Sequence, residues 1–179
     1  MMIYINSEIC SSLAVGMITD TNGFRNNNVD SNTFLMAADL IKYDINFYKI
    51  YETVLVTKSL PKHDLMKIAL DRLEFINDGK IAFTYLLKED FEKVGAKLGD
   101  HEGIVDIGRS ISGVEVSAFI RENDGFTVSL RSTGSVDVNK VASRFGGGGH
   151  KMAAGAQIDK NLQETKDIVI NEIKRVLQQ

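Results

Sequence analysis

The sequence lacks several features by which the class of a chain is often recognised. Its 179 residues include one cysteine, one proline and no tryptophan. Cys10 has no partner for a disulfide within the chain, so we expect a reduced, cytoplasmic setting. The longest weakly polar run, residues 9–19, is too short to span a bilayer, and no basic segment precedes it. We therefore expect no membrane partner and no signal peptide.

The chain also lacks an excess of positive charge. It carries 21 basic and 24 acidic residues, a net charge of −3, so any phosphate site must be a local feature. It contains no Gly-x-x-x-x-Gly-Lys-Ser loop, no Gly-x-Ser-x-Gly elbow and no Cys/His cluster, which argues against a P-loop, an α/β-hydrolase and a zinc site. With 44% hydrophobic and 25% charged residues, the composition is that of an ordinary globular protein.

The first part of the chain has mainly helical patterns. The apolar residues 13–18 end in the polar residues 19–23, which predicts a buried strand leading into an exposed turn. Helical spacing then predicts a helix to residue 45 after a cap region at 30–32, and a second helical stripe over 47–54. A third helix extends to residue 73, with Pro61 in its first turn.

Strand patterns follow residue 74. Alternating residues predict strands over 81–87, 114–120 and 126–130, and the turn residues 123–125 join the last two in a hairpin. A short helix over 138–145 has Asp137 near its N-cap, and a closing helix covers 162–176. These patterns predict a helix-rich N-terminal part, a helical connector and an α+β domain from about residue 75.

Four consecutive glycines, residues 146–149, directly follow the short helix. One glycine would suffice to end a helix, so the others indicate that this backbone approaches something closely. Bare N–H groups form anion-binding concavities, and His150 adds a protonatable side chain at the edge of the run. The alternative reading is a plain flexible loop.

Local charge favours an anion site. Residues 126–158 contain four basic residues and one acidic residue, a net charge of +3. Strand alternation places Thr127, Ser129 and Arg131 on one face of the strand. The apolar residues Phe126, Val128 and Leu130 lie on the opposite face. Arg131 and Ser132 then offer a guanidinium fork and a hydroxyl group at a strand end, which suits phosphate. A solvated arginine on a strand is the alternative.

Asp20 follows the predicted strand of residues 13–18. A carboxylate at the carboxyl end of a buried strand is well placed to bind a divalent cation, although such an aspartate is more often a turn residue. His63 and His101 stand apart from other ligand types, so we interpret both as surface or packing residues.

Several segments together resemble a known family. Residues 16–25 read Gly-Met-Ile-Thr-Asp-Thr-Asn-Gly-Phe-Arg, which is similar to the last metal-binding motif of DHH-family phosphoesterases. Residues 113–116, 128–132, 136–139 and 145–151 resemble the associated C-terminal domain of that family. The subgroup most similar to the chain is the bacterial oligoribonucleases that also act as 3′-phosphoadenosine-5′-phosphate phosphatases, often labelled exopolyphosphatase-related.

The resemblance implies an α/β fold in three parts. Residues 1–57 would be the remnant of a parallel-sheet catalytic domain, whose lone strand would have unpaired edges that a homodimer could cover. Residues 58–74 would be a helical connector. Residues 75–179 would be an α+β, mixed-sheet domain that binds substrate.

The resemblance also implies site residues and a cofactor. Family members hold two manganese ions with aspartates of several motifs and an Asp-His-His sequence. Only Asp20 matches a metal ligand here, so this chain alone would be an inactive part of a hydrolase. The residues that would hold the phosphate and terminal nucleotide of a short single-stranded RNA or nucleotide substrate are Arg131, Ser132, Gly147, Gly148, Gly149 and His150. Arg109 is a lower-ranked candidate for binding the same substrate.

Two other functions remain open at this point. The chain could be a freestanding nucleic-acid-binding module, because similar glycine-rich domains occur at the end of alanyl-tRNA synthetases. The remnant metal motif around Asp20 argues against a pure binding module. The chain could also belong to a hydrolase of polyphosphate or of cyclic dinucleotides, which the sequence does not distinguish from the first reading.

Overall fold

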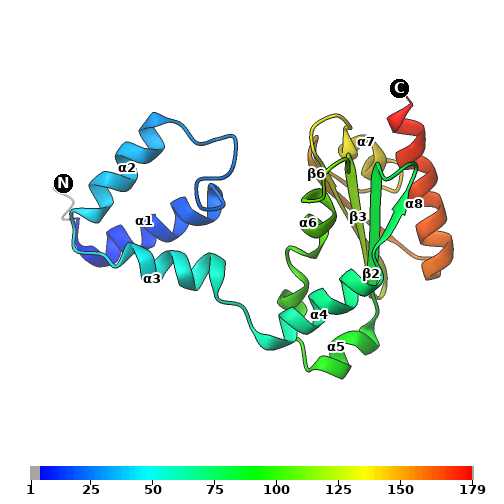
Figure 1. Cartoon of the computed structure of the whole chain (residues 1–179), viewed down its shortest axis with the longest axis horizontal. Coiled ribbons are helices and arrows are strands. Elements are labelled where there is room, and N and C mark those ends of the chain that lie inside the picture. Colours follow the sequence, from blue (N-terminus) through cyan, green and yellow to red (C-terminus); the bar gives the residue numbers. More distant parts are fainter. Residues whose placement is uncertain (1–4, 179) are drawn as a thin grey trace. The chain divides into compact units, whose positions relative to one another are not determined.

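The computed structural model describes residues 5–178, so residues 1–4 of the predicted catalytic remnant lie outside the described part. The chain divides after residue 58 into two compact units, called unit 1 (to residue 58) and unit 2 (from residue 59) (Figure 1). Within residues 5–178, no helix combines the length and apolar character that crossing a membrane requires.

Unit 1 is built from helices. They are α1 (Ser7–Asp20), α2 (Ser31–Ile41), α3 (Phe47–Tyr51) and a π-helical segment, η1 (Glu52–Val56). Asn6 caps α1 by accepting a hydrogen bond from the Ile9 N–H, and Asp30 forms a capping box at the start of α2. The buried core is small and consists of Cys10, Ala14 and Leu40.

The predicted strand over residues 13–18 is wrong, because these residues lie inside α1. The buried residues of α1 are Cys10, Ala14 and Ile18, a spacing of four that belongs to one helix face. Leu13 is 54% exposed, so the apolar run is not buried on all sides. A short apolar run does not distinguish a strand from a helix segment, and the Asn6 cap decides for the helix. Residues 5–58 contain no strand, so the remnant of a parallel sheet expected there is not seen in the described range.

Unit 2 contains a six-stranded sheet in the order β1-β2-β3-β4-β6-β5. Its strands are β1 (Glu74–Ile76), β2 (Ile81–Leu86), β3 (Val116–Asn123), β4 (Gly125–Ser132), β5 (Gly148–His150) and β6 (Ala153–Ile158). The β2–β3 pair is parallel and all other pairs are antiparallel, so the sheet is mixed. The predicted α/β class with a mixed C-terminal sheet is confirmed.

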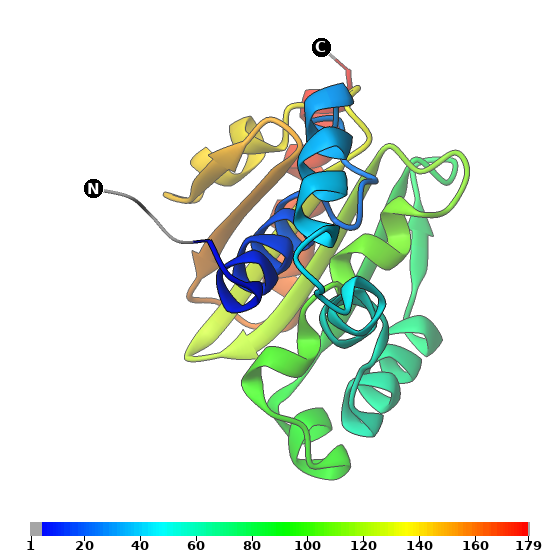
Figure 2. The same cartoon turned by 90° about the vertical axis from the view of Figure 1, so that its left-hand side faces the viewer.

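Helices cover both faces of this sheet. On one side lie α4 (Leu60–Asp71), α5 (Lys88–Val94), the 3-10 turn η2 (Leu98–His101) and α6 (Ile104–Arg109), and on the other lie α7 (Val138–Ser143) and α8 (Leu162–Leu177). Strand β3 shows the alternation, because Ala118 and Ile120 pack in the core with α7 and α8, whereas Phe119 packs with α4 and α6. Figure 1 shows α6 and α8 on opposite sides of the sheet, and Figure 2 shows α8 behind β4 and β6.

Local sequence patterns predicted several features of unit 2 correctly. The β3–β4 hairpin turns at residues 123–125, Asp137 caps α7, and Pro61 lies in the first turn of α4. Strands β1, β5 and β6 and helices α5 and α6 were not predicted. Helix α4, expected as a connector, buries Leu65 and Ala69 in a core cluster of unit 2.

A partly buried ion pair joins three elements of unit 2. Arg72, just after α4, donates to both carboxylate oxygens of Asp90 at 2.6 and 2.9 Å, and its guanidinium lies 4.7 Å from the ring centroid of Tyr85. The hydrogen bond to Asp90 raises the pKa of Arg72. Asp90 also accepts the N–H of Leu87 at 2.7 Å, which caps α5. The pair therefore holds α4, β2 and α5 together.

Replacing Asp90 with alanine is expected to destabilise the protein strongly. Asp90→Ala leaves the Arg72 charge without its partner and removes the cap of α5, which costs about 3 kcal/mol of unfolding free energy. Urea unfolding measures this cost. The control Lys160→Ala removes an exposed pair with Glu164 and is expected to cost about 0.2–1 kcal/mol. Equal losses in both variants would contradict the structural role of Asp90.

Candidate functional site

Four strands bring the candidate residues into one row across the sheet. His150 of β5 pairs with Ala153 of β6, Ala153 pairs with Arg131 of β4, and Arg131 pairs with Ser117 of β3. Residues directly opposite each other on neighbouring antiparallel strands point to the same face. Arg131 and His150 therefore share a face, with Cα atoms about 10 Å apart because two strand spacings separate them.

This face carries polar and small side chains between the two strands. We call it the β4–β6 strip, and its residues are Thr127, Ser129, Arg131, Ala153, Gly155 and Gln157. All of them are half-buried or exposed, whereas Phe126, Val128 and Leu130 point the other way and are buried. The predicted alternation along β4 is confirmed. The strip is accessible within unit 2 and offers the Ser129 hydroxyl and the Arg131 guanidinium, whereas the Thr127 hydroxyl donates to the Gln157 amide oxygen at 2.9 Å.

Arg131 shares a carboxylate with Arg109. Asp106 of α6 lies 3.1 Å from the Nε of Arg109 and 3.8 Å from the Nε of Arg131. The structure therefore brings the two candidate arginines together, and it adds an acidic residue that the charge count over residues 126–158 missed. The side chains of Asp106 and Arg109 are about 40% exposed. Exposed pairs of this kind contribute at most about 1 kcal/mol, so a phosphate group can replace Asp106 as the partner of Arg131.

Ser132 does not face the strip. Its register partner in β3 is Val116, and its side chain is fully buried on the opposite face. The hydroxyl oxygen accepts the N–H groups of Gly134 at 3.0 Å and Val136 at 3.3 Å. This side chain therefore stabilises the turn after β4, and a contact of Ser132 with substrate stays a prediction.

The glycine run is largely strand rather than loop. Gly148 to His150 form β5, which pairs with β6. A Cβ atom on Gly147 would lie 2.1 Å from the carbonyl oxygen of Gly155, and one on Gly149 would lie 2.5 Å from that of Ala153. Gly149 also has a φ of +150°, which disfavours other residues. The close approach that the run predicted is thus an approach to β6. The small residues 153–156 that permit it carry no usual strand signal.

His150 projects from β5 with an exposed side chain. It has no hydrogen bond or ion pair to another side chain within the described residues. Gly148, two residues before His150 on the same face of β5, has no side chain. The imidazole is therefore available to a ligand. His101 behaves as predicted for a packing residue, because it stacks on Phe119 with ring centroids 6.2 Å apart.

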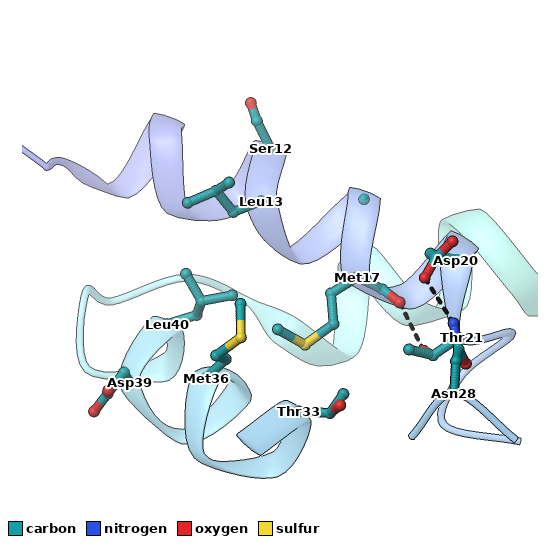
Figure 3. A pocket seen from close by; sticks show the side chains of 11 residues that line it. Ser12, Leu13, Met17, Asp20, Thr21, Asn28, Thr33, Met36, Asp39 and Leu40 are labelled. Atoms are coloured by element: carbon teal, nitrogen blue, oxygen red, sulfur yellow. Dashed lines mark hydrogen bonds between the residues drawn. The ribbon is translucent and has the colours of Figure 1, made fainter. Parts of the chain in front are cut away.

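Asp20 lies in unit 1, at the end of a helix rather than of a strand. Its Oδ2 accepts a hydrogen bond from the Asn28 amide at 2.8 Å. It lines a groove of about 560 Å³ between α1 and α2, together with apolar side chains that include Met17, Met36 and Leu40 (Figure 3). A carboxylate at a helix C-terminus is disfavoured by the helix dipole, and the asparagine amide offsets this.

Comparison with known proteins identifies the family. The family model of the DHHA1 domain matches residues 78–179. The bifunctional oligoribonuclease and PAP phosphatase NrnA of Thermus thermophilus is 31% identical over 175 residues, which cover 94% of this chain and 52% of the relative. Its counterpart in Bacillus subtilis is 28% identical over 159 residues, covering 86% of this chain and 49% of the relative.

A solved structure agrees with the sequence relatives. An exopolyphosphatase-related protein from Bacteroides fragilis superposes with a TM-score of 0.91 at 30% identity, covering 98% of this chain and 53% of that one. The chain therefore belongs to the DHHA1 domain family, and the resemblance to DHH-family phosphoesterases is confirmed. It spans about half the length of the relatives it matches.

Two neighbouring glycines provide a matched test of the β5–β6 contact. Gly147→Ala places a Cβ against the Gly155 carbonyl and is expected to cost about 1–3 kcal/mol of unfolding free energy through overpacking. Gly148→Ala meets only the Asn139 side-chain oxygen, at 3.7 Å, and is expected to be almost neutral. Denaturant unfolding compares the two. A Gly147→Ala protein as stable as the Gly148→Ala protein would contradict the close contact.

Proposed function

We propose that unit 2 binds the phosphate group of a short oligoribonucleotide or of a nucleotide such as 3′-phosphoadenosine-5′-phosphate. The observation that carries this proposal is the row formed by Arg131 and His150 on the accessible face of the sheet. Arg131 supplies a planar fork of donors, and His150 supplies a ring nitrogen. Arg109 contributes through Asp106, which both arginines share.

The binding step follows from these groups. A phosphate oxyanion competes with Asp106 for the Arg131 guanidinium, and charge-assisted hydrogen bonds favour the more highly charged anion. The Nη1 of Arg131 donates to the Leu130 carbonyl at 3.1 Å, which fixes the orientation of the side chain. Few base-specific groups face the strip, so binding by backbone phosphate rather than by sequence is expected.

The related enzymes support the substrate class. The relatives from Thermus thermophilus and Bacillus subtilis are named as oligoribonucleases and PAP phosphatases. We propose that this chain contributes the substrate-holding part of such a phosphoesterase.

The exposed apolar side chains of unit 1, among them Leu13, Leu35 and Met36, suggest that further protein covers them, and a homodimer is one arrangement that would do so.

The described residues do not fit a two-manganese site. Within residues 5–178, no group of three or more His, Cys, Asp or Glu side chains is arranged to hold a metal ion. Asp20 has an asparagine amide as its hydrogen-bonding neighbour. Two-metal hydrolysis requires several carboxylates around both ions. We therefore derive no hydrolytic step from this chain's own residues.

The purified chain is expected to bind substrate without hydrolysing it. With manganese and a short oligoribonucleotide, mononucleotide release should equal that of a protein-free control, because one carboxylate holds a divalent ion too weakly to activate water. Chromatographic product analysis measures the release. Turnover that Asp20→Ala abolishes would show a working metal site and contradict the account of an incomplete hydrolase.

Arg131 is expected to carry much of the phosphate affinity. Arg131→Gln removes hydrogen bonds to a charged group that are worth about 1.5–3 kcal/mol, so the Kd for adenosine 3′,5′-bisphosphate should rise about 10- to 100-fold. Calorimetric titration measures this Kd. The control Arg175→Gln changes an exposed arginine of α8, which packs on the other face, and should leave the Kd unchanged. Equal Kd values for the wild type and Arg131→Gln would overturn the proposed site.

A further inference from the structure

A second arginine lies on the same face of the sheet as Arg131. Arg121 of β3 pairs with Thr127, which belongs to the β4–β6 strip. Ser117, the β3 partner of Arg131, precedes Arg121 by four residues. Four residues of a strand span about 13 Å, so the two arginines stand near opposite ends of the strip.

Arg121 is half-buried and lacks a partner in the described part of the chain. Its Nε is shielded from solvent and has no hydrogen bond, and no ion pair involves it within residues 5–178. Burial lowers the pKa of the Arg121 guanidinium. A shielded charge without a partner is unfavourable, so an anion placed beside it gains more than one beside a paired, solvated arginine.

Arg121 lines a cavity of about 320 Å³ at the end of β3. Lys88 and Asn123 add polar groups to this cavity, while Phe91 and Leu98 form an apolar wall. Two carboxylates, of Glu92 and Glu122, also line it. The Glu122 carboxylate accepts the Lys88 N–H at 3.0 Å, so it has a partner of its own.

The two arginines are held apart by their contacts. Arg131 faces Asp106 of α6 and the Leu130 carbonyl, whereas Arg121 faces the cavity beside α5. One phosphate group is too small to contact both. Between them the strip presents the hydroxyl group of Ser129, with Gly155 leaving the β6 backbone bare. The Thr127 hydroxyl, at the Arg121 end, donates to the Gln157 side chain at 2.9 Å.

We propose that Arg121 binds a second phosphodiester of a single-stranded oligoribonucleotide whose end phosphate is held at Arg131. This inference rests on the proposed function and adds to it a preference for oligonucleotides over mononucleotides. The strand would lie along the β4–β6 strip, with an unstacked base against the apolar wall of the Arg121 cavity.

The test compares ligands of increasing length on the full chain without added metal. The probes are adenosine 3′,5′-bisphosphate and 5′-phosphorylated adenylate oligomers of two to five nucleotides. Wild-type protein should bind the longest oligomers more tightly than the bisphosphate. Arg121→Gln should weaken the binding of the longest oligomers about tenfold and leave the binding of the bisphosphate unchanged. Arg131→Gln should weaken the binding of the oligomers and of the bisphosphate. Arg175→Gln is the matched control and should behave as wild type.

Salt dependence provides a readout that a loss of folding would not imitate. The slope of log affinity against log salt for the pentamer should become shallower by about 0.7 in Arg121→Gln, which is one phosphate contact on a single strand. Arg121→Lys, which keeps the charge, should retain the wild-type slope. An Arg121→Gln protein with wild-type affinity and slope for every oligomer would overturn this inference while the Arg131 site stands. Failure of wild-type protein to bind any probe would overturn the proposed function itself.

Discussion

The backbone of residues 147–149 lies so close to β6 that no side chain fits between them at Gly147 or Gly149. This contact makes β5 a strand, and the pairing of His150 with Ala153 follows from it. Through the same register Arg131 comes to stand in line with His150, although 18 residues of chain separate them. The glycines therefore act on the site through sheet geometry. Bare N–H groups alone do not explain why two of these positions exclude a Cβ atom.

Charge on the accessible face is arranged in two different ways. Arg131 and Arg109 share the exposed carboxylate of Asp106, which keeps them oriented at little cost in free energy. Arg121 forms no ion pair within the described residues, and its Nε atom is shielded from solvent. A sheet face with one arginine paired to a carboxylate and a second arginine without an ion pair suits an extended polyanion better than a single phosphate group. The apolar face beneath it, packed on α7 and α8, supplies the rigidity that such a platform needs.

Local signals predicted the parts of the structure that depend on neighbouring residues. The hairpin at residues 123–125, the Asp137 cap and the alternation of β4 were predicted because turn chemistry and strand period are local. Strand β6 was missed because Ala153, Ala154 and Gly155 have no strand preference and form a strand only through pairing with β4 and β5. The apolar run at residues 13–18 was misassigned as a strand, because its residues fit the period of a helix as well as that of a strand. Asp106 escaped the charge count because α6 meets Arg131 only in the folded sheet.

Mapping the bisphosphate on the protein by NMR tests the central claim most directly. Backbone amide shifts of the 15N-labelled chain are followed while adenosine 3′,5′-bisphosphate is added. The account predicts that the largest changes fall on the row of Arg131, Ala153 and His150 and on Asp106 and Arg109, with α8 unaffected. Amide shift changes confined to α7 and α8, or no shift change at any concentration of the bisphosphate, would contradict a phosphate site on this face of the sheet.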